Sequence, residues 1–272
     1  MYPAITISLV PEAKGGPFVY WSGLSEACAD AAGLGFAAIE IFPRGVEGFD
    51  RAELKTLLRL HSLKLAAMGT GAGWVVHKLS LTHSDTVIRL RAREFIRSII
   101  DLAGAFGAPA IIGSMQGRWE GDMTRTKALN VLAEALEDLG AYAATYGVPL
   151  LYEPLNRYET NLINRIGDTA NWLRTLRTTN IRILADMFHM NMEESDLAAA
   201  LREAGSLIGH VHFADSNRRA IGFGHTAILP IIAALREIQY TGALSAEILP
   251  EPDAATAARQ TLLSFQRALA TP

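Results

Sequence analysis

Ile181-Arg-Ile-Leu-Ala-Asp186 is a short apolar run that ends on a carboxylate, and it sets the pattern for the second half of the chain. An ionised carboxylate at the end of a buried strand is costly unless a partner compensates its charge. Three further runs end on an acidic or imidazole side chain: Pro149-Leu-Leu-Tyr-Glu153, Ile208-Gly-His-Val-His212 and Ala243-Leu-Ser-Ala-Glu247. If these strand ends converge, the three carboxylates would repel one another without a cation, so the pattern predicts a bound divalent metal ion.

Short strand-like runs alternate with longer helical patterns along the whole chain. The runs Ala37-Ala-Ile-Glu-Ile-Phe42 and Ala110-Ile-Ile112 are apolar rather than alternating, which is typical of parallel strands covered on both faces. We expect strands at 4–9, 37–42, 63–69, 109–113, 149–154, 181–187, 208–214 and 242–249. We expect helices near 22–34, 50–61, 84–106, 125–146, 166–177, 195–204, 226–238 and 253–269.

Eight β/α units without a linker predict one α/β domain over residues 1–272, a single closed (β/α)8 TIM barrel. The structural rival is a doubly wound open sheet, which usually carries a glycine-rich phosphate loop after its first strand. Val10-Pro-Glu-Ala-Lys-Gly-Gly16 does not fit Gly-x-Gly-x-x-Gly, so we favour the barrel. The predicted metal ligands then follow strands five to eight on one rim: Glu153, Asp186, His212 and Glu247.

Composition narrows the class of partner and compartment. The chain has 272 residues, of which 50% are hydrophobic, and its net charge of −3 shows no basic excess that would favour nucleic acid or an anionic membrane as a partner. We see neither a signal peptide nor an apolar run of the roughly eighteen residues that span a bilayer. Cys28 is the single cysteine, so no intrachain disulfide can form. We therefore expect a cytoplasmic protein.

The predicted metal ligands are rich in oxygen. Three carboxylates and one imidazole suit Mn²⁺, Mg²⁺ or Co²⁺ better than a metal that prefers thiolates, while Zn²⁺ stays open. For any single residue, the alternative is a polar strand end that hydrogen-bonds a neighbour. Four such residues in register on one rim favour the metal site.

Three segments around these residues resemble the ketose 3-epimerases, the D-tagatose and D-allulose 3-epimerases of the xylose isomerase-like barrel superfamily. They are Glu153-Pro-Leu-Asn-Arg-Tyr-Glu-Thr-Asn161, Asp186-Met-Phe-His-Met-Asn-Met-Glu-Glu194 and His210-Val-His-Phe-Ala-Asp-Ser-Asn-Arg218. The resemblance is strong over 149–250 and looser in the first half, which includes Leu79-Ser-Leu-Thr-His-Ser-Asp85.

The resemblance implies a small-molecule sugar substrate, a homodimer or homotetramer, and one divalent metal, commonly manganese, on the four strand-end residues. It also implies that Glu153 and Glu247 form the acid/base pair. The positions that match the family's sugar contacts are Glu159, His189 and Arg218.

The chemistry of C3 epimerisation agrees with this assignment. The reaction removes a proton α to the C2 carbonyl, and a metal chelated by the carbonyl and a neighbouring hydroxyl oxygen stabilises the developing cis-enediolate. One carboxylate takes the proton from one face, and a second returns a proton from the opposite face. Ligands from strands five and eight can flank the substrate. We therefore assign these roles to Glu153 and Glu247, with Asp186 and His212 as metal anchors.

Each supporting residue keeps an alternative. His189 could hydrogen-bond the C2 oxygen or be a loop histidine, and Arg218 could bind a hydroxyl, support a glutamate or be solvated. Glu159 could hold the substrate or be an exposed loop residue. Trp119 and Phe42 could form an apolar wall for the distal sugar atoms or serve only in packing.

The segment after the fourth strand departs from the family. Gly113-Ser-Met-Gln-Gly-Arg-Trp119 does not reproduce the aromatic wall that the resemblance leads us to expect there. The arginines Arg118, Arg218 and Arg219 also leave room for a phosphorylated sugar.

Other functions remain to be separated from the metal-dependent sugar epimerase or isomerase. A lyase or dehydratase acting on an inosose or a 3-keto-glycoside would begin with the same proton abstraction. An apurinic endonuclease shares the barrel but needs more histidines from early strands. The ends of strands three and four instead read Gly69-Thr-Gly71 and Gly113-Ser114. A non-catalytic sugar-binding module would not need both glutamates.

Overall fold

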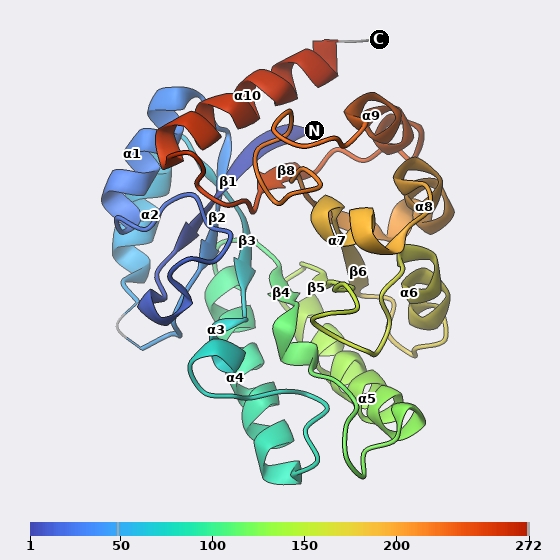
Figure 1. The fold of residues 1–272 in the computed structure, drawn as a ribbon. Helices are drawn as coiled ribbons and strands as arrows, with labels where there is room; N and C mark the ends of the chain where they lie inside the picture. The colour runs from blue at the N-terminus through green and yellow to red at the C-terminus, as the bar shows by residue number, and fades with distance from the viewer. Residues whose placement is uncertain (48, 271–272) are drawn as a thin grey trace.

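Eight parallel strands close into a barrel in the computed structural model, which describes residues 1–47 and 49–270 (Figure 1). Each strand pairs with the next along the chain, and β8 pairs with β1, so the sheet has no free edge. The predicted TIM barrel is therefore confirmed. The strands are β1 (Tyr2–Ser8), β2 (Ala38–Phe42), β3 (Lys64–Gly69), β4 (Ala110–Ile112), β5 (Leu150–Tyr152), β6 (Ile181–Asp186), β7 (Ile208–His212) and β8 (Ala243–Ala246).

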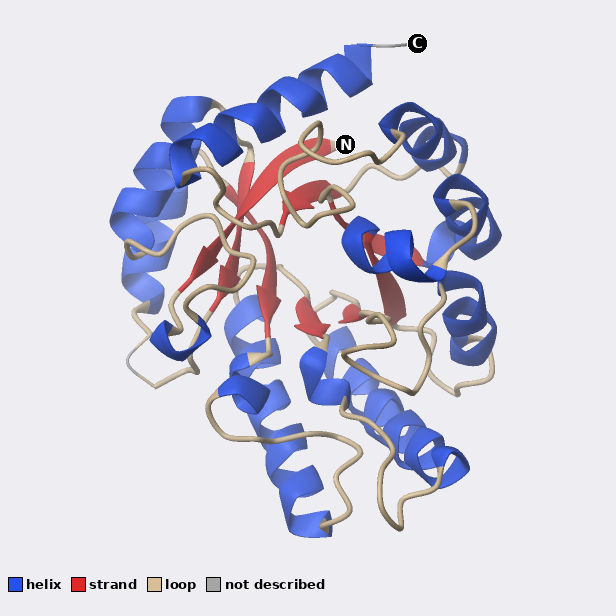
Figure 2. Cartoon of the chain, viewed as in Figure 1, coloured by secondary structure: helices blue, strands red, loops and turns tan. Residues whose placement is uncertain are grey.

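Helices form an outer ring around these strands (Figure 2). No helix in the described ranges is both long and apolar enough to cross a bilayer. Two short helices were not predicted: α3 lies in an expected loop, and α7 begins at the last residue of the strand expected at 181–187. The helices are α1 (Leu24–Leu34), α2 (Arg51–Leu60), α3 (Ala72–Val75), α4 (Thr86–Gly104), α5 (Arg125–Ala144), α6 (Ile166–Leu173), α7 (Met187–Glu193), α8 (Leu197–Ala204), α9 (Ile228–Glu237) and α10 (Ala254–Ala270).

The strand residues explain why one end of the barrel is packed and the other is open. Small side chains form a separate cluster of their own, which includes Ala4 and Ala38. Because side chains alternate along a strand, Thr6 shares its face with Ala4, and Glu40 shares its face with Ala38. Thr6 and Glu40 line the central cavity, so the same faces that pack at one end carry polar groups toward the C-terminal ends of the strands.

Strands β5 and β8 are shorter than predicted, and each ends one residue before a glutamate. Glu153 follows β5, and its backbone N–H still donates to the carbonyl of Ile112 at 3.0 Å. Glu247 follows β8, and its N–H donates to the carbonyl of Ser245 at 3.1 Å, which turns the chain out of the sheet. Both glutamates therefore stand on the rim.

Candidate metal centre

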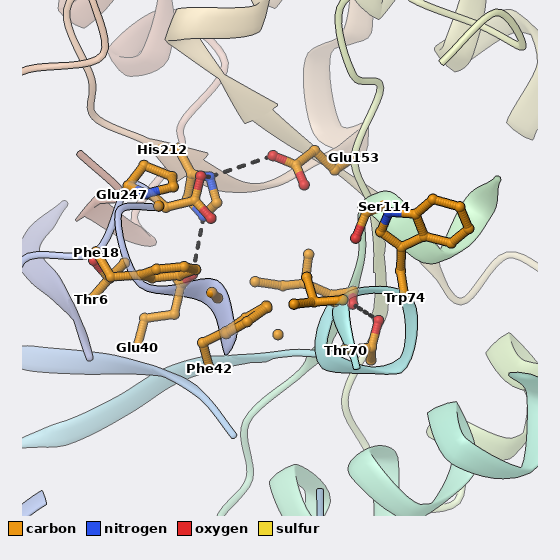
Figure 3. Close-up of a pocket in the computed structure, with 18 of the residues that line it drawn as sticks. Thr6, Phe18, Glu40, Phe42, Thr70, Trp74, Ser114, Glu153, His212 and Glu247 are labelled. Carbon is orange, nitrogen blue, oxygen red and sulfur yellow. Dashed lines mark hydrogen bonds and ion pairs between the residues drawn. The ribbon is translucent and has the colours of Figure 1, made fainter. Parts of the chain in front are cut away.

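The structure brings the four predicted metal ligands together, with His212 between three carboxylates. The distance from His212 Nδ1 is 3.5 Å to Glu153 Oε1, 3.4 Å to Asp186 Oδ2 and 3.6 Å to Glu247 Oε2. One donor atom from each of the four residues lies within 4.8 Å of all the others. Figure 3 shows Glu153 and Glu247 reaching toward the same imidazole from different sides.

A buried oxygen without a hydrogen-bond partner indicates whether this cluster fits a metal ion. Glu153 Oε1 is buried and accepts no hydrogen bond, although buried carboxylate oxygens normally have partners. The carboxylates of Glu153, Asp186 and Glu247 all turn an oxygen toward the same point. Three oxygens and one imidazole nitrogen form a donor set that hard divalent cations prefer. The cluster therefore fits a divalent metal.

A fourth carboxylate, that of Glu40 on β2, orients the imidazole of His212. Glu40 Oε1 lies 3.1 Å from His212 Nε2, and its Oε2 lies 2.7 Å from His210 Nε2. Burial raises the pKa of Glu40, but the charges and hydrogen bonds of the two histidines outweigh burial and hold that pKa far below its usual value. With Nε2 engaged, Nδ1 of His212 faces the carboxylates, and such a carboxylate–histidine pair fixes the ring for metal binding.

The sequence analysis missed Glu40. A charged residue in the middle of the apolar run 37–42 was the available signal, because a buried carboxylate needs a partner. The partner histidine lies 170 residues further along the chain, so only the closed barrel brings the two together.

Glu247 is held by Arg218, whose Nη2 donates to Glu247 Oε2 at 2.7 Å. Burial raises the pKa of Glu247 to about 7. The charges of His212 and Arg218 act against this rise, while the neighbouring carboxylates add to it. Arg218 also lies 4.7 Å from the ring centroid of Phe188, so its guanidinium is fixed by both a charge and an aromatic face.

The loop after β7 positions Arg218. Arg218 adopts a left-handed φ of 59° and donates its N–H to the carbonyl of Asp215 at 2.8 Å. Burial raises the pKa of Asp215, but the backbone hydrogen bonds that its carboxylate accepts outweigh burial, so that the pKa lies below its usual value. These bonds tie the loop into one shape, and they come from the N–H groups of Ser216, Gly222, Gly224 and Thr226.

Asn156 fixes the tautomer of His189. The amide oxygen of Asn156 accepts from the N–H of Tyr158 at 2.9 Å, and Nδ2 donates to Glu159 Oε1 at 3.0 Å. This orientation directs Nδ2 to donate to His189 Nδ1 at 2.7 Å. Because Nδ1 accepts, the N–H of the ring is on Nε2, which is buried, has no partner and lies 3.8 Å from Glu153 Oε1. His189 presents a free N–H donor to the cavity.

Gln116 and Gly113 position Glu153. The buried amide of Gln116 donates to the carbonyls of Glu153 at 2.9 Å and Gly113 at 3.0 Å, and it accepts from the hydroxyl of Tyr152 at 2.7 Å. A Cβ at position 113 would clash with Glu153 Oε2. Glycine is therefore required there if the carboxylate is to keep this position.

The cluster opens into a cavity of about 400 Å³. Phe42 lines it and stacks on Phe18 with 4.6 Å between ring centroids, which agrees with the apolar wall considered for Phe42. Trp119 does not line this cavity; its indole N–H donates to the carbonyl of Asn161 at 3.0 Å. Trp74 on α3 lines the cavity instead, which the sequence analysis did not foresee (Figure 3).

The predicted sugar contacts also lie at this cavity. Glu159, His189 and Arg218 line it together with three of the four predicted metal ligands. Asp186 lies beside them, buried at the start of α7, where its Oδ1 accepts from the N–H of Phe188 at 2.7 Å. The unpredicted helix α7 is what directs His189 back toward the cluster.

Comparisons with known proteins agree with the geometry. A family model described as a xylose isomerase-like TIM barrel matches residues 28–267. The L-ribulose 3-epimerase of Methylomonas sp. (strain DH-1) is 31% identical over 243 residues, which cover 86% of this chain and 83% of that protein. The D-psicose 3-epimerase of Agrobacterium fabrum is 29% identical over 239 residues, 86% of this chain and 79% of that protein. The crystal structure of D-allulose 3-epimerase from Methylomonas sp. matches with a TM-score of 0.81 at 26% identity, covering 98% of each chain.

Proposed function

The chain belongs to the xylose isomerase-like TIM barrel family, and from this premise we propose that it is a metal-dependent epimerase that inverts C3 of a free ketose. The single observation that carries the proposal is the convergence of Glu153, Asp186, His212 and Glu247 within 4.8 Å at the base of an open cavity. The curated relatives named above support the reaction class.

We propose that these four side chains hold one divalent ion, with Mn²⁺ as the native metal. The oxygen-rich donor set with one imidazole supports this choice. When bound, the ion would polarise the substrate carbonyl and stabilise the negative charge that develops on its oxygen.

Glu153 and Glu247 carry the two proton transfers in this proposal. Their carboxylates reach the cluster from the ends of two different strands, β5 and β8, and lie on different sides of His212 (Figure 3). One carboxylate removes the C3 proton from one face of the sugar, leaving an enediolate. The other delivers a proton to the opposite face, which inverts the centre. The enantiomer of the substrate decides which carboxylate acts as the base.

His189 and Arg218 position the reacting groups. The Nε2–H of His189 is free to donate to the C2 oxygen of the substrate. Arg218 fixes one oxygen of Glu247 and leaves the other available for the proton. Glu159, which accepts from Asn156, lies where it can accept from a sugar hydroxyl.

Loss of the C3 proton to solvent tests the proposal. Protein loaded with Mn²⁺ is incubated in D₂O with D-fructose, D-tagatose and L-ribulose, and proton NMR follows each C3–H. We expect slow loss of this signal in at least one ketose, together with signals of its C3 epimer. Chelator-treated protein is the control and should give neither.

Two results would redirect the proposal. A product that has lost water or an aglycone, without an epimer, would indicate a lyase that shares the first step. If no ketose in a broad panel shows exchange or epimer formation, the assignment to C3 epimerisation is wrong.

A further inference from the structure

A second cavity, of about 510 Å³, adjoins the cavity above the carboxylate cluster. The two cavities share part of their lining, so they are neighbouring compartments of one opening. The shared residues come from the segments after β3, β4 and β5, and they are Trp74, Ser114, Leu155 and Glu159. We call the second compartment the outer cavity.

The outer cavity has a fixed floor. Ser80 and Thr82 are buried there, and the Thr82 hydroxyl lies 3.0 Å from the carbonyl oxygens of Gln116 and Arg118. The segment around Gly117 packs closely against Thr82, since a Cβ at position 117 would clash with Thr82 Oγ1. Gly117 also has a φ of 81°, which favours glycine. The loop before α4 and the loop after β4 are therefore tied together, and the cavity between them is built into the fold.

The rim of the outer cavity carries charges of both signs. Lys78 and Arg118 bring positive charge, while Glu120 and Glu159 bring negative charge. A phosphate group is best bound where cations stand without opposing carboxylates. Mixed charges beside hydroxyl groups suit a neutral group with many hydroxyls, which needs donors and acceptors together.

Trp74 supplies the apolar part of the surface. Its side chain is exposed at the boundary between the two compartments, and Lys78 Nζ lies 5.3 Å from its ring centroid. The carbon-bound hydrogens of a pyranose ring form an apolar face that can lie on an indole. A large exposed aromatic beside polar groups is also a common feature of ligand sites.

The volumes of the two cavities indicate that a single ketose would occupy only the inner one. The inner cavity of about 400 Å³ contains the acid/base pair and leads outward to Trp74. A single ketose held with C2 and C3 at the carboxylates would leave the outer cavity of about 510 Å³ unfilled. Both volumes fall in the range of about 300 to 1,000 Å³ that is usual for small-molecule sites.

We propose that the outer cavity is a subsite for a second sugar ring, so that the preferred substrate is a ketose glycosylated at the end remote from C3. This inference rests on the proposed function, because the ketose end must reach Glu153 and Glu247. The second ring would lie against Trp74 and hydrogen-bond the polar groups of the outer cavity.

Isomaltulose is a suitable probe, since it is D-fructose that carries a glucosyl ring on O6 and keeps its C2 carbonyl and C3–H. We expect kcat/KM for C3 epimerisation to be at least about tenfold higher for isomaltulose than for D-fructose, through a lower KM, because the added contacts form already in the ground state. Calorimetric titration of both sugars into the Mn²⁺-loaded protein should show the same order of affinity.

Ser84→Trp fills the outer cavity without touching the inner one, because Ser84 is exposed and lines only the outer compartment. This variant should lose the advantage of isomaltulose in both kinetics and binding, while D-fructose turnover stays within about twofold. Ser25→Trp, at an exposed position on α1, is the matched control and should behave as wild type.

The outcomes separate this inference from the proposed function. If D-fructose is epimerised but isomaltulose is neither turned over nor bound more tightly, the subsite is refuted and the epimerase stands. If Ser84→Trp weakens both sugars equally, the outer cavity has no separate role and the inference fails. If neither sugar reacts but isomaltulose binds more tightly in a manner sensitive to Ser84→Trp, the subsite stands and the epimerase fails.

Discussion

The two halves of the barrel rim differ in chemistry. The C-terminal ends of β5 to β8, with the residues that directly follow them, bring three carboxylates and an imidazole to one point. The C-terminal ends of β1 to β4 and the loops after them bring aromatic rings, glycines and hydroxyls to the same cavity, such as Phe42, Gly69 and Ser114. The late half therefore holds the side chains to which we assign the metal and the proton transfers, while the early half shapes the space that we propose for the substrate. Changes in the late half should affect every substrate, and changes in the early half should affect the choice among substrates.

Neutralising Glu153 tests the late half most severely. Glu153→Gln keeps the shape of the side chain but removes the proton acceptor, so C3 exchange and epimer formation should fall by about 10²- to 10⁴-fold for every ketose tested. NMR in D₂O measures both rates. Glu134→Gln, at an exposed position on α5, is the matched control. Turnover that survives undiminished in Glu153→Gln would remove this residue from the proton transfer.

Glu40 departs from the division, because it reaches from the early half to the imidazole of His212. Glu40→Gln should weaken metal binding by about 10- to 100-fold, as is usual when the partner of a metal-binding histidine is lost. Competition with a fluorescent chelator measures the dissociation constant directly. Glu94→Gln, exposed on α4, should leave it unchanged. An unaltered affinity in Glu40→Gln would show that the imidazole is held in other ways.

Metal affinity should rise with pH, because the metal-free site holds protons that the ion must displace. Burial raises the pKa of Glu247 to about 7. The pKa of His212 also lies well above its usual value, because Glu40 and Glu247 outweigh the effect of burial. Each displaced proton adds about a factor of ten in affinity per pH unit, so the rise should be steepest below pH 7. Calorimetry in buffers of different ionisation enthalpy counts these protons, and release of none at pH 6 would contradict the account.

Gly71→Ala tests the early half. A Cβ there would lie 2.7 Å from Cε2 of Phe42, so this ring, which lines the cavity, must shift and change the shape of the cavity. We expect relative kcat/KM values among ketoses that differ at C4 to C6 to change by about tenfold, while metal affinity stays constant. Gly33→Ala is the control, because a Cβ there meets nothing within 4 Å. A uniform loss across all ketoses would mean that this half does more than select substrates.

The sequence predicted those features that depend on a local pattern of residues. The alternation of strand-like runs with helical patterns predicted the barrel. Four runs that end on an acidic or imidazole side chain predicted the converging residues, because the C-terminal ends of parallel strands share one rim. Contacts between distant segments could not be predicted in this way. Glu40 meets His210 across the barrel, and Trp119 turns to Asn161 rather than to the cavity. The turn that places His189 arises from α7, too short a helix to leave a clear periodic pattern.

The most direct test of the central claim is anomalous diffraction from crystals soaked in Mn²⁺. The account predicts one peak in contact with Glu153, Asp186, His212 and Glu247. The described residues contain a second acidic and imidazole group, Glu40 with His210 and His212. A peak on that group alone, or no peak at saturating Mn²⁺, would contradict the account.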